Sequence, residues 1–245
     1  PATSGTMMRT GFAGKDCAIA AFTVNDLNRS SSLTEKLPQG IVNFMALTRV
    51  ARGPMVNSPL FTIDGRPTYD PSRVYYFGAS LGGIMGNVFM AYEPSIEKGV
   101  LGVSGGNWSL LFERSVAWPP LRGAMIGAYP ARFAYATNIA LMGMGFDRYD
   151  PITTTPRIVL DPLPGVPAKK IFMYEAVADS LVTNLATEMV ARVMGIPLLG
   201  PSVRAPFGID EATEPQGSGL LIIDEQVTPV PPVGNVAPEE DNGTH

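Results

Sequence analysis

The chain has very few of the residues that bind metal ions or form disulfides. Its 245 residues include one cysteine, Cys17, and one histidine, His245. A lone cysteine excludes a disulfide within the chain and a thiolate metal cluster. One histidine and scattered carboxylates supply no tetrahedral ligand set, so we expect no metal site.

Charge and long apolar runs are scarce as well. Charged residues make up 16% of the sequence, the formal net charge is −4, and lysine and arginine form no run. This argues against a surface for nucleic acid or anionic membranes. No apolar stretch reaches the roughly 18 residues that span a bilayer. Phosphate-loop and dinucleotide fingerprints are also missing, so we expect a small, weakly charged substrate and no cofactor.

The apolar segments that are present alternate between strand-like and helix-like patterns. The sequence is 45% hydrophobic. Its length suits one globular domain, residues 1–245, with one hydrophobic core. A strand, a helix and a further strand in succession imply a right-handed parallel crossover. We therefore predict an α/β fold whose mostly parallel sheet is flanked by helices. The predicted strands are 17–24, 73–77, 100–103, 170–174 and 220–223, and the predicted helices are 38–52, 81–92 and 182–194.

Residues 105–168 interrupt this alternation with short apolar pieces and many glycines and prolines. We predict a helical insertion here, a candidate cap over the sheet. Its large apolar residues suit an apolar acyl or aromatic group, although each of them is also an ordinary core residue. The ones singled out for substrate binding are Trp108, Met142 and Met144, with Phe112, Trp118, Met125, Tyr129, Phe133 and Phe146 beside them.

Gly78-Ala79-Ser80-Leu81-Gly82 matches the G-x-S-x-G motif of a serine nucleophile. A predicted strand enters it and a predicted helix leaves it, which is the setting of a nucleophile elbow. We expect small residues at Gly78 and Gly82 to permit a strained turn at Ser80. The first amide of the helix, at Leu81, is then the expected oxyanion donor.

A second match, Gly102-Val103-Ser104-Gly105-Gly106, competes with the first. It also follows a predicted strand, but Asn107 and Trp108 do not continue it as a clear helix. Ser80 is therefore favoured over Ser104, and a purely structural glycine turn is the third reading.

His245 is the one available base, and a solvated chain end is the alternative reading of it. Chain order favours catalysis, because α/β hydrolases place the nucleophile first, the acid after a later strand and the histidine last. Asp179 follows the strand 170–174 and precedes a helix, so it is either the acid of a triad or a helix cap. The other candidate acids are Asp210, Asp224 and Glu175.

Several of these segments together resemble a family of bacterial α/β-hydrolase esterases over most of the chain. They are the run RVYYFGASLGGIMG from Arg73, the pair Arg114-Ser115, the segment ADSLVTN with Glu188 and Ala191-Arg192, and Asn235 with the closing NGTH. The resemblance implies a triad of Ser80, Asp179 and His245 and an acyl-enzyme mechanism without a cofactor.

The chain departs from that family in two places. Members carry several strands and an oxyanion loop with His-Gly or Gly-Gly before the strand that corresponds to 19–24, and they continue past the catalytic histidine. We therefore expect an N-terminally incomplete domain in which 19–24 is an interior strand. A second polypeptide would supply its missing neighbours.

Other functions remain open at this stage. A catalytically silent α/β-hydrolase domain would serve as a binding or assembly module, and an acyltransferase or a cofactor-free haloperoxidase would use the same triad. Arg114 and Arg192 suit a substrate carboxylate, although structural ion pairs are the favoured expectation for both.

Overall fold

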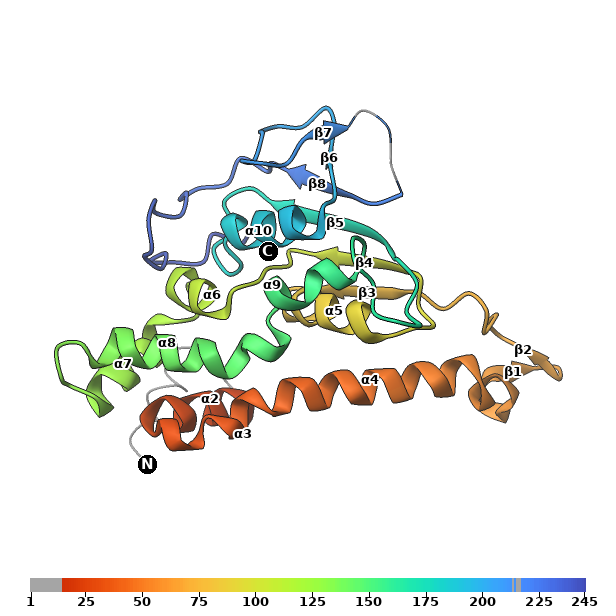
Figure 1. The fold of residues 1–245 in the computed structure, drawn as a ribbon, viewed down its shortest axis with the longest axis horizontal. Coiled ribbons are helices and arrows are strands. Elements are labelled where there is room, and N and C mark those ends of the chain that lie inside the picture. The colour runs from red at the N-terminus through yellow and green to blue at the C-terminus, as the bar shows by residue number, and fades with distance from the viewer. Residues whose placement is uncertain (1–14, 213, 215–216) are drawn as a thin grey trace.

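The structure is a computed structural model that describes residues 15–212, 214 and 217–245. Within these residues a six-stranded sheet has the order β3-β4-β5-β8-β6-β7, and every neighbouring pair is parallel (Figure 1). A parallel sheet flanked by helices confirms the predicted class. The strands are β3 (Tyr76–Ala79), β4 (Lys98–Gly102), β5 (Lys170–Ala176), β6 (Leu198–Leu199), β7 (Glu211–Ala212) and β8 (Gly219–Ile223), and β1 (Thr62–Ile63) and β2 (Arg66–Pro67) form a separate antiparallel pair.

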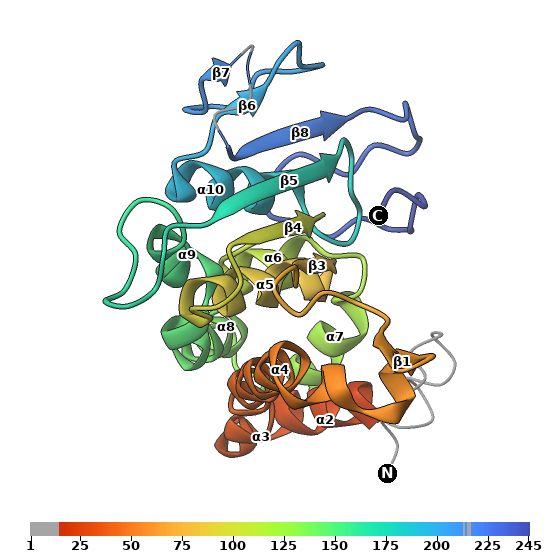
Figure 2. The ribbon, with the colours of Figure 1, turned by 90° about the vertical axis from the view of Figure 1, so that its right-hand side faces the viewer.

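Helices occupy most of the remaining described chain. The α-helices are α2 (Lys15–Asn25), α3 (Ser31–Thr34), α4 (Lys36–Arg52), α5 (Leu81–Tyr92), α6 (Trp108–Arg114), α7 (Pro119–Ala128), α8 (Ala134–Phe146), α9 (Pro151–Thr154) and α10 (Asn184–Met194). The short 3₁₀ turns are η1 (Leu27–Arg29), η2 (Pro54–Asn57), η3 (Pro59–Phe61), η4 (Asp147–Tyr149) and η5 (Thr155–Arg157). Helices α2 to α4 lie at one end of the molecule and β6 to β8 at the other (Figures 1 and 2). No helix in the described part is long and apolar enough to cross a membrane.

Most predicted elements form close to their predicted bounds. Helix α5 has the predicted ends, and α4, β5 and β8 extend their predictions by one to two residues at an end. Strand β4 begins two residues before its prediction and ends one residue before it, and α10 begins two residues late. The strand predicted at 73–77 is displaced, because β3 covers Tyr76–Ala79 and runs directly into Ser80. Helix α10 ends where predicted because Gly195 adopts φ +73°, a left-handed conformation that a glycine takes without strain. The predicted helical insertion at 105–168 contains α6, α7, α8 and α9.

The predicted strand at 17–24 is wrong, because these residues belong to helix α2. Ala21 and Val24 are buried, and α2 packs against α7 rather than inside the sheet. A short, fully apolar run does not distinguish a buried strand from a buried helix, and three alanines in this run favour the helix. The interior strand expected at 19–24 therefore does not exist. Strands β6 and β7 were not predicted, since two residues carry no recognisable pattern.

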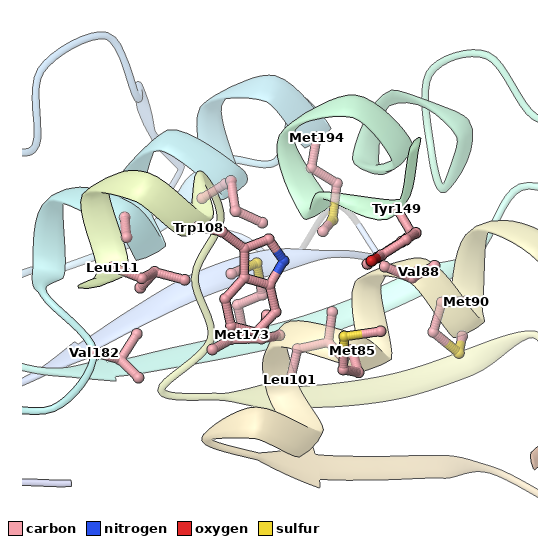
Figure 3. Close-up of a cluster of buried hydrophobic side chains, with 14 of the residues drawn as sticks. Met85, Val88, Met90, Leu101, Trp108, Leu111, Tyr149, Met173, Val182 and Met194 are labelled. Atoms are coloured by element: carbon pink, nitrogen blue, oxygen red, sulfur yellow. The ribbon is translucent and has the colours of Figure 1, made fainter. Parts of the chain in front are cut away.

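The hydrophobic core is enclosed by the sheet, by α5 and by the helices of the insertion. Helix α5 is buried almost from end to end and packs on β3 and β4. Met85 and Val88 of this helix lie beside Leu101, Met173 and Trp108 (Figure 3).

In the described part of the chain, the face of the sheet turned away from α5 and α10 is apolar and largely exposed. Phe77, Val100 and Phe172 are register neighbours on β3, β4 and β5, so their side chains share one face. Phe77 is 70% exposed and Phe172 39% exposed, whereas Ile171 and Met173, which alternate with Phe172, are fully buried. Parallel sheets usually have both faces covered. This face, which we call the bare face and which also includes Ile223, is therefore unusual.

We expect a single methyl group at Gly83 to destabilise the fold. A Cβ there would lie 2.4 Å from the Gly102 carbonyl oxygen of β4, which forces α5 away from the sheet. Gly83→Ala should therefore lower the free energy of unfolding in urea by about 1–3 kcal/mol. The matched control is Gly123→Ala in α7, where an added Cβ meets nothing within 4 Å. This control should raise stability by about 0.5–1 kcal/mol, and equal effects of the two variants would contradict the packing described.

Candidate active site

Ser80 occupies a strained turn between β3 and α5. Its φ is 56° and its ψ is −126°, a backbone conformation that residues other than glycine rarely adopt. The Ser80 amide donates to the Gly102 carbonyl at 3.1 Å, which ties the turn to β4. The side chain is half-buried at the carboxyl edge of the sheet, and helix α5 begins at the next residue, Leu81.

Of the two glycines in the motif, only Gly78 is required by close packing. A Cβ at Gly78 would lie 2.4 Å from the Gly82 carbonyl oxygen, so the turn closes only with glycine there. A Cβ at Gly82 would meet nothing within 4 Å, which contradicts the predicted need for a small residue at that position. The backbone approach that was expected at Gly82 occurs one residue later, at Gly83.

Ser104, the competing candidate, is inaccessible. Ser104 is fully buried, and its hydroxyl accepts a hydrogen bond from Asn87 Nδ2 at 2.7 Å. Its carbonyl accepts from the Thr187 hydroxyl. These bonds join α5, α10 and the segment after β4, so Ser104 has a structural role.

Asp179 and His245 lie together, although 66 positions separate them in the sequence. His245 Nδ1 is 3.0 Å from Asp179 Oδ2. The other carboxylate oxygen, Oδ1, accepts from the amides of Leu181 and Val182, each at 2.8 Å. Asp179 does not cap α10, whose N-cap residue is Thr183. The carboxylate is 1% exposed and the imidazole 18% exposed, so their contact is shielded from water.

Two asparagines from the segments ADSLVTN and NGTH, which had no predicted role, hold the backbone next to Asp179. Ala178 has φ +67°, and its amide donates to Asn184 Oδ1 at 2.9 Å. The Ala178 carbonyl accepts from Asn242 Nδ2 at 2.8 Å. Asn242 Nδ2 also donates to the Pro229 carbonyl at 3.0 Å. Asn242 therefore connects the segment that carries His245 to the loop that carries Asp179. No spacing pattern links these residues in the sequence.

The other candidate acids have no contact with His245 among the described residues. Asp210 and Asp224 are exposed, and Asp224 accepts from the amide of Gln226. Glu175 is fully buried at the end of β5, where it pairs with Arg204.

Glu175, Glu188 and Arg204 form a buried charge cluster beside the Asp179 loop. Arg204 Nη2 contacts one carboxylate oxygen of each glutamate, so two carboxylates share one guanidinium. Burial raises the pKa of Glu175 to about 8, and the nearby Glu188 acts in the same direction, against the opposing effect of Arg204. The excess negative charge in this cluster therefore favours the uptake of one proton.

The ion pairs expected for Arg114 and Arg192 are not found among the described residues. Arg192 donates to the Phe207 carbonyl and lies over the Phe207 ring, 5.4 Å from its centroid. Arg114 lines a cleft with Asp179, Glu188 and Arg204, and its Nε has no hydrogen-bond partner.

A cavity of about 360 Å³ adjoins Ser80. Trp108, Phe112 and Trp118 line it, and all three come from the insertion. Met142 and Met144, the other two predicted substrate-binding residues, are not part of its wall. Met142 is 2% exposed in the core and Met144 is 67% exposed at the surface, because the two residues are only two positions apart on α8 and point in different directions.

Comparisons with known proteins find only distant likeness. No protein-family model and no curated protein matches the chain. Among solved structures, acetyl xylan esterase 1 from Thermoanaerobacterium sp. JW/SL YS485 is similar over 74% of this chain and 47% of its own, with 15% identity and a TM-score of 0.42. A puromycin-hydrolyzing peptidase from Mycobacterium tuberculosis is similar over 63% of this chain and 18% of its own, with 14% identity and a TM-score of 0.38.

A third similar structure is MGS-M2, an α/β hydrolase from a Medee basin deep-sea metagenome library. It shares 11% identity over 62% of this chain and 57% of its own, with a TM-score of 0.34. The chain thus spans less than two thirds of each of these proteins. Their TM-scores lie below 0.5, so the case for this chain rests on its own residues.

The charge cluster makes stability depend on pH. The pKa of Glu175 is 4.5 in the unfolded chain and about 8 in the folded protein. The folded protein therefore binds this proton more tightly, and the resulting stabilisation is complete below pH 4.5 and lost as the pH rises through about 8. Urea unfolding of Glu175→Gln between pH 5.5 and 8.5 should show a smaller loss of stability with rising pH than the unchanged protein. Glu239→Gln at the surface is the control, and an equal pH dependence of all three proteins would refute this assignment.

Proposed function

We propose that the protein is a serine hydrolase that cleaves a carboxylic ester through an acyl-enzyme intermediate. The observation that carries the proposal is the placement of Ser80 in a strained turn on the same sheet edge as the Asp179–His245 pair. Ser80 follows β3 and Asp179 follows β5, with β4 between these two parallel strands. Parallel neighbours are about 4.8 Å apart, so the two loops emerge from one edge about 10 Å from each other. An imidazole is long enough to reach across such a gap. Among the described residues His245 is hydrogen-bonded to Asp179 and not to Ser80, so the Ser80–His245 bond is part of the proposal.

The proposed mechanism assigns one role to each residue. His245 accepts the Ser80 proton as Ser80 Oγ attacks the ester carbonyl, and it then donates the proton to the leaving alcohol. Asp179 holds His245 Nδ1–H and stabilises the imidazolium that forms. The Leu81 amide, at the first position of α5, has no partner within the helix and faces the developing oxyanion. Water then attacks the acyl-enzyme with His245 as the base, and no cofactor takes part.

Helices α6 and α7 serve in this proposal as the cap over the site. They follow β4 in the chain, and Trp108, Phe112 and Trp118 extend from this region to the cavity beside Ser80. Apolar walls around the nucleophile exclude water and strengthen the electrostatic interactions that stabilise the oxyanion.

The second candidate function is a catalytically silent module that binds a second polypeptide. The bare face favours it, because exposed aromatic residues such as Phe77 and Phe172 on a parallel sheet usually contact another part of a protein. The two candidates differ in one property, which is the reactivity of Ser80.

Labelling with a fluorophosphonate probe tests this reactivity. The protein should react covalently with the probe and hydrolyse a short p-nitrophenyl ester, whereas Ser80→Ala should lose the labelling and at least about 1,000-fold in kcat. Ser104→Ala is the matched control, because Ser104 lies in the competing motif and is fully buried. It should still be labelled. A folded protein that neither reacts nor hydrolyses would favour the silent module.

Asn242 provides a second test, because in this proposal it positions the catalytic base. Asn242→Ala removes the bonds to the Ala178 and Pro229 carbonyls and should loosen His245 relative to Asp179. We expect kcat to fall about tenfold, as for other supporting groups of an active site, while KM changes less than about twofold. Asn235→Ala, an exposed change in the same tail, should leave both constants unaltered. A proportional rise in KM would contradict the positioning role.

A further inference from the structure

The cavity beside Ser80 has walls that select against polar groups. Its lining side chains with polar atoms are Ser80, Ser115 and the indoles of Trp108 and Trp118, and no ionisable side chain lines it among the described residues. The Trp118 indole N–H is bonded to Tyr135, whereas the Trp108 indole N–H has no partner there. A charged group or an unpaired hydroxyl placed inside would lose its hydrogen bonds to water and find few replacements. The occupant is therefore apolar and uncharged.

One side of the cavity, which we call the Ala20 wall, is built by two separate parts of the chain. Trp118, Pro120 and Leu121 come from the start of α7, whereas Ala20 comes from α2. Helix α2 packs against α7. The Leu27 amide, just after α2, donates to the Tyr129 hydroxyl at the end of α7 at 2.8 Å. The helix that was predicted as a strand thus closes one side of the cavity.

The position of the cavity favours the acyl side of an ester over the alcohol side. Ser80 and Leu81 both line it, and they are the residues assigned to the nucleophile and the oxyanion donor. The acyl group stays on the nucleophile while the alcohol departs and water enters. A cavity with mostly apolar walls suits the group that stays.

We propose that this cavity binds the acyl group, that it accepts straight-chain or aromatic acyl groups of up to about ten carbon atoms, and that Ala20 helps to set this limit. The limit lies below the roughly 14 carbon atoms that the volume of about 360 Å³ gives in proportion to benzene, because the reacting carbonyl group occupies part of this space. An apolar cavity of about 150 Å³ is enough for the six carbons of benzene. The proposal deepens the proposed function and rests on it.

The first experiment measures kcat/KM for p-nitrophenyl esters from acetyl to dodecanoyl. Each methylene group that enters the cavity should raise kcat/KM about threefold, up to about ten carbons, and longer chains should gain nothing more. A benzoyl ester should also be cleaved faster than the acetyl ester. A flat series that is still abolished by Ser80→Ala would overturn the acyl-cavity proposal and leave the hydrolase assignment intact.

Two variants change the cavity in opposite directions. Ala20→Phe fills part of it and should lower the ratio of octanoyl to acetyl kcat/KM at least tenfold, while Leu121→Ala enlarges it and should move the optimum to longer chains. Ala128→Phe places the same side chain on the exposed surface of α7 and should leave the ratio unchanged. Equal ratios in Ala20→Phe, Leu121→Ala and the unchanged protein would overturn the role of this wall.

Calorimetric titration with octanoic acid separates binding from catalysis. The unchanged protein should bind octanoic acid at least tenfold more tightly than acetic acid, and Ala20→Phe should remove most of this difference. If no ester is hydrolysed but this binding pattern holds, the hydrolase proposal fails and the apolar specificity of the cavity is supported. If octanoic and acetic acid bind equally, the cavity proposal fails whatever the esterase assay shows.

Discussion

The close packing of helix α5 on strands β3 and β4 is the constraint on which the rest of the structure depends. Gly83 allows the helix to approach the Gly102 carbonyl, and Gly78 allows the chain to reverse direction into the helix. With both contacts made, Ser80 is held at a positive φ and its amide is bound to β4. The strain at Ser80 is maintained by packing that involves the whole length of α5, since a local turn alone would relax.

The candidate triad depends on a second long-range arrangement. The loop after β5 reaches its shape through bonds from Asn184 at the start of α10 and from Asn242 near His245. Asn184 accepts from the Ala178 amide and Asn242 donates to the Ala178 carbonyl, next to Asp179. The Glu175–Arg204–Glu188 cluster adjoins this loop, with Glu175 on β5, Glu188 on α10 and Arg204 between β6 and β7. Glu175 Oε2 and Arg204 Nε have no hydrogen-bond partner among the described residues. The bonds to Ala178 and to the Asp179 carboxylate are therefore what limit the movement of the acid of the proposed triad.

The two sides of the sheet differ in a way that bears on function. One side is packed by α5 and α10 and leads to the cavity with aromatic walls, while the bare face exposes Phe77 and Phe172. A hydrolase site on one side and an unpaired apolar surface on the other are compatible within one molecule. The proposed activity and the proposed association would therefore depend on different residues.

The sequence by itself determined the parallel α/β class, the elements around Ser80 and the order Ser80, Asp179, His245, because these depend on local periodicity and on short motifs. It did not distinguish the helix at 15–25 from a strand, since an apolar run is buried equally well in either form. Nor did it place Met142 and Met144, whose directions depend on which face of α8 meets the core. The contact between Asp179 and His245, the roles of Asn184 and Asn242 and the wall formed by Ala20 were decided only by the tertiary structure. Each of them joins segments far apart in the chain, and no local pattern encodes such a distance.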